Sequence, residues 1–171
     1  MEAVGNSNTR PKLLLKQFHS YRYAHQDPQS QISGDTGYFQ EPNQLLMTGS
    51  LKSIQHRKPH QQEVYADRAV ATFDAVSIQD VLDGAATKNI KLFENIKLLQ
   101  SQDAILTTQA TYDIKTDRIY SDAPVRVEGQ KRWSTGEHGF IYDMSSSNVE
   151  VFGPIEGVVD PNELSQSHHS D

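Results

Sequence analysis

Apolar and polar residues alternate with a period of two along much of the chain. Between 119 and 128, the apolar residues and their small neighbours fall on one parity, and charged residues fall on the other. The runs AILTTQATYD (104–113) and EVYADRAVATFD (63–74) alternate in the same way, the second with an interruption at Asp67. This pattern is typical of a strand with one buried face. The residues that we expect on the buried faces include Tyr65, Ala69, Ala71, Phe73, Leu106, Ala110, Tyr112, Ile119, Ala123, Val125 and Val127.

Polar, turn-forming segments separate these runs, which predicts an all-β protein with antiparallel strands. Two segments could be helical. SIQDVLDGA has helical spacing, with Ser77 as a cap and Gly84 as a stop, and it predicts a short helical turn. NIKLFENIKLL fits a strand or a helix, and we assign a strand because it is short and strands flank it.

A degenerate internal repeat organises the predicted strands. Four segments each begin with a small residue, continue with an aromatic residue and turn into a second strand. Aligning Gly37, Ala69, Ala110 and Gly139 gives spacings of 32, 41 and 29 residues, and the longest contains the segment 76–86, which we interpret as an insertion. Such repeats predict stacked strand pairs that bury their apolar faces against their neighbours.

Length and composition limit the possible classes of protein. The 171 residues, 36% of them hydrophobic, suit one domain, and we expect polar tails at 1–17 and 160–171 around a domain at 18–159. The net charge of −6 argues against an extended nucleic-acid surface. The chain has no cysteine, which excludes disulfides and thiolate sites, and it has no apolar stretch long enough to span a membrane.

Several polar residues could in isolation suggest chemistry. Glu137-His138 lacks an HExxH motif, and its flanking Gly136 and Gly139 indicate a bend where another strand comes close. Asp113 and Asp143 could form a carboxylate pair for glycoside hydrolysis, but their place before polar turns favours a structural role.

Two further features also favour a structural interpretation. Ser121 and Ser134 lack a nucleophile-elbow motif. The pair His168-His169 could bind a metal weakly, although a polar tail explains it better. We therefore expect no enzyme, no cofactor and no metal site.

The segment AILTTQATYDIKTDRIYSDAPVRVEGQKRWSTGEHGFIYD resembles the core of the LptC family, the periplasmic lipopolysaccharide-export component of Gram-negative bacteria. Upstream, TGSLKSI and EVYADRAVATFD resemble repeats that this family shares with LptA/OstA-like proteins. The resemblance extends from Phe18 to Val159. It implies an open β-jellyroll of two antiparallel sheets, built from repeated strand pairs around an apolar interior.

The resemblance also implies a role and partners. Members receive lipopolysaccharide from an inner-membrane ABC transporter of the LptBFG type and pass it to an LptA-like bridge. They normally carry an N-terminal transmembrane helix, which is not in this sequence, so we expect a periplasmic domain that is anchored if such a helix precedes it. A periplasmic β-repeat scaffold that binds proteins only remains the alternative.

A lipid with several acyl chains needs a long apolar trough, and a free edge strand can pair with a partner's sheet. We expect the last strand-like segment, SNVEVFGPIEGVV, to dock the next protein, with Pro154 limiting the pairing. The candidate lipid-binding residues are Tyr65, Phe73, Leu92, Leu106, Tyr112, Ile119, Val125, Val127 and Phe140. The candidate docking residues are Val149, Val151, Phe152, Ile155 and Val158.

Overall fold

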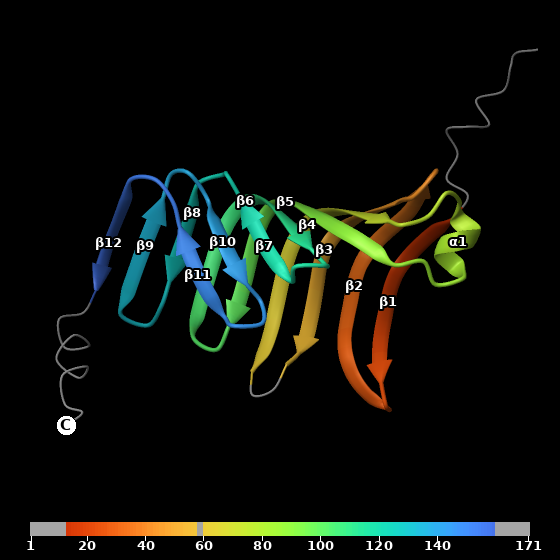
Figure 1. The fold of residues 1–171 in the computed structure, drawn as a ribbon, viewed down its shortest axis with the longest axis horizontal. Helices are drawn as coiled ribbons and strands as arrows, with labels where there is room; N and C mark the ends of the chain where they lie inside the picture. The colour runs from red at the N-terminus through yellow and green to blue at the C-terminus, as the bar shows by residue number, and fades with distance from the viewer. Residues whose placement is uncertain (1–12, 58–59, 160–171) are drawn as a thin grey trace, which may run out of the picture.

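The computed structural model describes residues 13–57 and 60–159. This part of the chain forms one antiparallel sheet of twelve strands and one short helix, which confirms the all-β prediction (Figure 1). The first strand begins at Leu14, inside the range expected for the N-terminal tail. The elements are β1 (Leu14–Ala24), β2 (Asp27–Gln40), β3 (Gln44–His56), β4 (Gln61–Phe73), α1 (Ile78–Leu82), β5 (Thr87–Gln100), β6 (Asp103–Asp113), β7 (Arg118–Ser121), β8 (Val125–Glu128), β9 (Arg132–Gly136), β10 (Phe140–Asp143), β11 (Asn148–Val151) and β12 (Ile155–Val159).

The sheet folds over itself into two facing layers, which makes an open jellyroll. Four long strands, β3 to β6, bend near their middles and contribute one half to each layer. We call the layer that contains β8, β9 and β12 the first layer, and the layer that contains β7, β10 and β11 the second layer. The long strand β6 marks the division, because its first half pairs with β8 and its second half pairs with β7.

The bends are irregular positions at which the strand register shifts, and they differ between alternate strands. In β3 and β5, the inward residues on either side of the bend are four positions apart, so parity is kept, and two of the three residues between them have positive φ, namely Gly49-Ser50 and Glu94-Asn95. In β4, by contrast, the buried residues on either side of the bend are Ala66 and Ala69, three positions apart. A step of three reverses the parity of inward residues, because side chains alternate sides along a strand.

In the C-terminal half, separate short strands form the two layers and the chain crosses between them. The crossings follow β7, β9 and β11, and they lie along the upper edge of Figure 1. The nine-residue strand that we expected over 119–127 is therefore two strands in different layers, broken around Pro124. The expected last strand is likewise divided into β11 and β12, with Pro154 in the crossing between them.

The predicted repeat corresponds to a structural unit. Gly37, Ala69, Ala110 and Gly139 are all buried at the point where a strand enters the second layer and begins a hairpin there. Segment 76–86 is an addition to the second of these hairpins, as expected. It contains α1, whose cap is Ser77 and which buries none of its residues.

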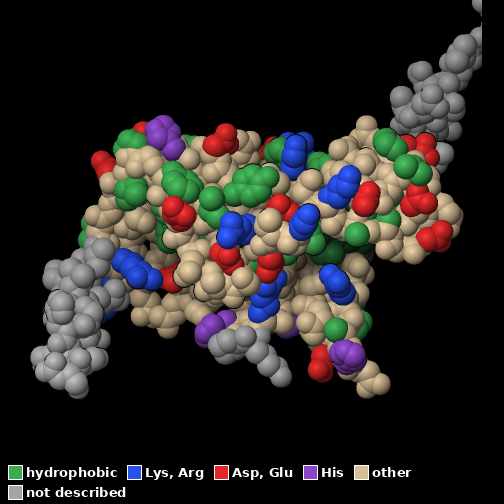
Figure 2. Space-filling view, viewed as in Figure 1, with side chains coloured by type: hydrophobic (Ala, Val, Ile, Leu, Met, Phe, Trp, Pro, Cys, Tyr) green, Lys and Arg blue, Asp and Glu red, His purple; other side chains and the backbone are tan. Residues whose placement is uncertain are grey.

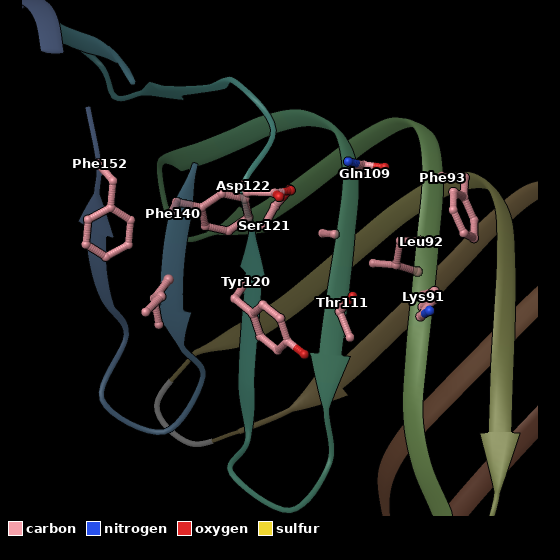
Figure 3. A pocket seen from close by; sticks show the side chains of 12 residues that line it. Lys91, Leu92, Phe93, Gln109, Thr111, Tyr120, Ser121, Asp122, Phe140 and Phe152 are labelled. Atoms are coloured by element: carbon pink, nitrogen blue, oxygen red, sulfur yellow. The ribbon is translucent and has the colours of Figure 1, made fainter. Parts of the chain in front are cut away.

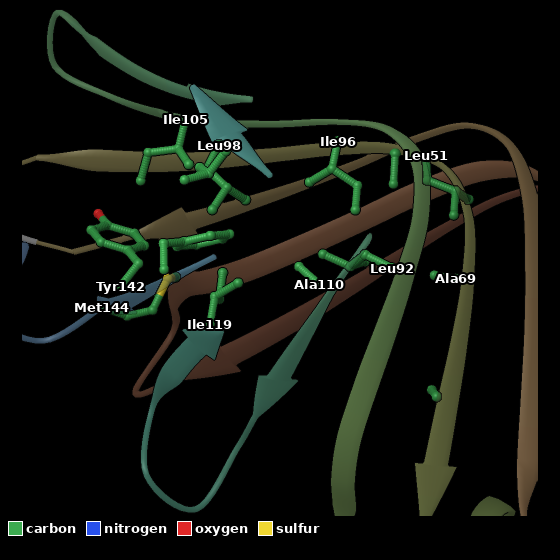
Figure 4. Close-up of a cluster of buried hydrophobic side chains, with 14 of the residues drawn as sticks. Leu51, Ala69, Leu92, Ile96, Leu98, Ile105, Ala110, Ile119, Tyr142 and Met144 are labelled. Carbon is green, nitrogen blue, oxygen red and sulfur yellow. The ribbon is translucent and has the colours of Figure 1, made fainter. Parts of the chain in front are cut away.

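The two layers share one hydrophobic core, in which side chains from both layers face each other (Figure 4). Ile96 of the first layer is 1% exposed, and so are Ile119 and Met144 of the second. Phe140 is fully buried. In the described part of the chain, no helix has the length and apolar character needed to cross a membrane.

Candidate functional site: the apolar interior between the layers

Two hollows lie between the layers, one on each side of the central core. Toward the N-terminal strands, a cavity of about 60 Å³ is lined by inward residues of both layers, including Leu51, Ala66 and Leu92. Toward the C-terminal end, a larger hollow of about 790 Å³ opens between β8 and β9 on one side and β10 and β11 on the other. Its apolar wall includes Leu98, Ile105, Val127, Tyr142, Val149 and Val151.

Most residues predicted to bind lipid face this interior. Leu92, Ile119, Val125 and Phe140 are buried members of the core, and Phe73, Tyr112 and Val127 pack against it. Tyr112 and Ile119 line the smaller hollow, and Val127 lines the larger one. The structure thus brings these seven residues to one continuous wall, and their contact with lipid remains a prediction.

Tyr65 and Leu106 lie elsewhere, on the outer face of the first layer. The ammonium group of Lys52 lies 5.5 Å from the centre of the Tyr65 ring, and the Tyr65 hydroxyl donates to Glu63 over 2.9 Å. Leu106 pairs across strands with the outward residues Lys97 and Arg126. We expected both residues in the interior, and this prediction is wrong. The bends of β4 and β6 reverse the parity of inward residues, and the prediction assumed a constant parity along each strand.

Sequence reasoning missed several residues of the interior wall. Leu98 and Ile105 are 3% and 4% exposed and line the larger hollow. Leu98 shares the parity of Leu92 in the strand interpretation of NIKLFENIKLL but was not among the candidate lipid-binding residues, and Ile105 lies beside the outward Leu106, which the alternation favoured. The segment AILTTQATYD gives no signal for Ile105 over Leu106, because both are apolar and Leu106 directly precedes the TTQ segment where the strand bends.

A polar network joins the layers on the side opposite the bends. Arg57 donates two hydrogen bonds to the carboxylate of Asp117, over 2.5 and 2.7 Å, across 60 positions of sequence. The hydroxyl of Tyr112 also donates to Asp117, over 2.8 Å. Hydrogen bonding to Asp117 raises the pKa of the Arg57 guanidinium, and burial raises the pKa of the Tyr112 hydroxyl.

A third hollow, of about 540 Å³, lies outside the interior, on the outer face of the second layer (Figure 3). Tyr120, which is 45% exposed, projects beside it, and Lys91, Gln109 and Asp122 add polar groups. Figure 2, viewed from the same side as Figure 1, shows hydrophobic side chains near the upper ends of β7 and β10. The hollow has only one wall of sheet behind it, so it offers an acyl chain less enclosure than the interior does.

The acidic residues considered for catalysis stabilise turns. Asp113 accepts a hydrogen bond from the backbone N–H of Lys115 over 3.0 Å. Asp143 accepts from the hydroxyl of Ser145 over 2.7 Å and from two backbone N–H groups, and these bonds hold its pKa well below the usual range. His138 is exposed in the crossing after β9, where its backbone N–H donates to Phe152 over 3.0 Å.

The strands at the C-terminal end are free on one side. Within the described residues, β11 pairs only with β10, and β12 pairs only with β9. Their inward residues Val149 and Ile155 are 38% and 58% exposed, because no further strand of the described chain covers the end of the interior. Val151 packs against the core, Phe152 lies in the crossing, and Val158 is 53% exposed on the outer face.

This geometry defines a class of protein, an open β-jellyroll with an apolar interior and, within residues 13–57 and 60–159, free strand edges at its C-terminal end. A family model described as "Lipopolysaccharide-assembly, LptC-related" matches residues 2–160, and the chain belongs to this family. The curated proteins that were searched give no significant match.

Among solved structures, the chain is similar to LptH from Pseudomonas aeruginosa, described as the LptA homologous periplasmic component of the conserved lipopolysaccharide transport device. The TM-score is 0.59 at 10% identity, over 77% of this chain and 95% of LptH. The similarity shows a common fold.

Proposed function

We propose that the protein is a non-enzymatic carrier that binds the acyl chains of lipopolysaccharide between its two layers. The sugars remain in water, and the chains move along the interior by passive binding. The observation that supports this most is the apolar wall shared by both layers, which opens into a hollow of about 790 Å³ at the C-terminal end. Family membership favours the same ligand.

Burial of apolar surface provides the affinity. Each buried methylene group contributes about 0.8 kcal/mol, so a few acyl chains suffice for stable binding without any specific polar contact. Such binding has little directional preference, which suits a carrier that must release its cargo. The energy for directional movement would come from an ABC transporter of the LptBFG type.

We further propose that an LptA-like protein docks on the free edges of β11 and β12. Strands added to both edges would cover Val149 and Ile155, which are partly exposed. They would also extend the interior of one protein directly into that of the next. This arrangement fits a periplasmic location, held at the inner membrane by contact with the transporter or by a membrane anchor.

Site-specific photo-crosslinking tests the lipid site. Val127 and Arg126 are neighbours on β8, and Val127 lines the larger hollow while Arg126 stacks on the outer Trp133, 4.6 Å from its ring centre. A photoreactive residue at position 127 should crosslink to lipopolysaccharide in the purified protein, and the same residue at position 126 should not.

The outcome separates the two functions considered. Crosslinks to lipopolysaccharide at position 127 but not 126 support the carrier. A folded protein that gives no lipid crosslink at position 127, but does crosslink to an LptA-like protein through β11 or β12, would instead establish a scaffold that binds proteins only.

A further inference from the structure

A set of polar side chains bridges the tips of the two layers. The turn between β3 and β4 carries Arg57, and the turn between β6 and β7 carries Asp117, to which Arg57 is bound through both carboxylate oxygens. The other ion pairs of the described residues, such as Arg68–Glu94, Arg118–Asp143 and Arg126–Glu128, do not join the tips of the two layers. The Arg57–Asp117 pair therefore connects the layers rather than neighbouring strands.

Beside this pair, buried and partly buried amides continue the bridge. Gln62 of the first layer donates to the Tyr142 hydroxyl and to the backbone carbonyl of Met144, each over 3.0 Å. Gln100, also of the first layer, accepts from the Tyr142 hydroxyl and donates to the Ser147 hydroxyl. We call these residues the polar latch: Arg57, Gln62, Gln100, Asp117, Tyr142 and Ser147.

The polar latch lies along the slit between the layer tips, on the side opposite the bends and crossings. The ends of β3, β5 and β10, which lie along the lower edge of Figure 1, border this slit. Tyr142 of the latch lines the hollow of about 790 Å³, and Tyr112, which donates to the latch residue Asp117, lines the hollow of about 60 Å³, so the latch lies beside both hollows. The smaller hollow is about 60 Å³ against about 790 Å³ for the larger one, so the interior is much narrower on that side.

The position of the latch has a geometric consequence for a carrier. A lipid whose acyl chains lie inside and whose sugars lie in water must pass its connecting atoms through the slit. Any bond that joins the two tips therefore blocks movement of that lipid along the slit. The lipid cannot pass from one end of the interior to the other unless the bond opens.

The bonds of the latch are of a kind that can open. The side chains of Arg57 and Asp117 are 32% and 26% exposed, so water can replace each partner. The Oε1 atom of Gln62 is buried and has no hydrogen-bond partner among the described residues. A buried network that is only partly satisfied stabilises the closed form less than a complete one would.

We propose that the polar latch is a gate, and that the layers must separate at Arg57–Asp117 and at Gln62, Gln100, Tyr142 and Ser147 for each lipid to pass. This inference rests on the proposed carrier function. It adds that the interior has a closed resting state and that transfer along it is limited by opening of the slit.

Because the chain contains no cysteine, a cysteine pair can lock the gate selectively. We would replace Gln100 and Ser147 by cysteine and join them with a short bis-methanethiosulfonate reagent, which forms a disulfide with each thiol as sulfinate leaves and which a reductant cleaves. A second pair, Asp74→Cys with Lys88→Cys, is the control, because these exposed residues lie on neighbouring ends of β4 and β5 within one layer. Photoreactive residues at Leu92 and, separately, Val127 report lipopolysaccharide on either side of the latch.

The expected result is lipid crosslinking at both positions in the cleaved protein and in the control pair, but at no more than one position in the locked protein. Equal crosslinking at both positions in the locked protein would overturn the gate and leave the carrier function intact. Absence of lipid at both positions in the unlocked protein would overturn both proposals.

A loosened gate gives an independent measurement. Asp117 has a φ of 55°, a conformation that asparagine also adopts readily, so Asp117→Asn removes the charge without straining the turn. Loading of the Leu92 position should become about tenfold faster, since a charged hydrogen bond is lost. Asp74→Asn, which changes an exposed carboxylate paired with Lys88 within one layer, should leave the rate unchanged, and equal rates in all three proteins would contradict the gate.

Discussion

At the scale of single residues, Gln62 shows how a polar group is used inside this apolar interior. Its side chain is 3% exposed, and its amide group donates hydrogen bonds to the Tyr142 hydroxyl and to the carbonyl of Met144 in the opposite layer. Its neighbour Gln61 is exposed and bonds only to Glu63 in the hydrogen bonds described. Two adjacent glutamines therefore have different roles, which depend only on which face of β4 they occupy.

Replacing Gln62 by methionine should destabilise the fold by about 1–3 kcal/mol, because the carbonyl of Met144 and the Tyr142 hydroxyl lose a buried donor. Gln61→Met is the matched control and should change the free energy of unfolding by less than about 0.5 kcal/mol. Urea unfolding of both variants provides the measurement. Similar values for the two variants would contradict the buried role of Gln62.

At the scale of elements, the bends in the strands determine which inward residues could be predicted from the sequence. Alternation predicted the strands, the turns and the repeat, since these depend on local patterns. Leu92 was placed correctly because the bend of β5 preserves the parity of inward residues, whereas Tyr65 and Leu106 were not because the bends of β4 and β6 reverse it. The size of a bulge depends on pairing with the next strand, which a local pattern does not contain.

The crossings between layers also depend on specific backbone geometry. Gly139 has a φ of +94°, and a Cβ atom there would collide with the backbone of Ser121 and Asp122 in the neighbouring crossing. Gly139→Ala should therefore destabilise the fold by more than about 2 kcal/mol, combining backbone strain with a clash that no rotamer relieves.

Gly84→Ala is the matched control for that measurement. Gly84 also has a positive φ, of +100°, but no atom lies within 4 Å of the added Cβ. Its cost should be limited to the strain of the left-handed conformation, about 1 kcal/mol. Thermal or urea unfolding of both variants would separate the two terms, and equal losses would contradict the close approach of the crossings.

At the scale of the whole molecule, the interior and the free edges belong to one arrangement. The same strands, β11 and β12, end the sheet and leave the inward residues Val149 and Ile155 partly exposed. An added strand would both complete the hydrogen bonding of the edges and lengthen the trough.

Ile155→Asp should weaken binding of an LptA-like protein by at least about tenfold, since an apolar contact worth about 1.5–3 kcal/mol is replaced by a buried charge. Calorimetric titration of the two purified proteins gives the affinity. The neighbouring outward variant Glu156→Gln is the control. Unchanged affinity in Ile155→Asp would place the partner elsewhere.

If lipid occupies the space between the layers, a photo-crosslinking scan along β6 will locate it there. The inward residues Ile105, Thr107, Ala110 and Tyr112 should crosslink to lipopolysaccharide, and the outward residues Leu106, Thr108, Gln109 and Thr111 should not. The positions that crosslink should therefore be odd-numbered before the bend and even-numbered after it. Labelling that alternates every second residue throughout β6, or that is absent at the inward positions, would contradict the account.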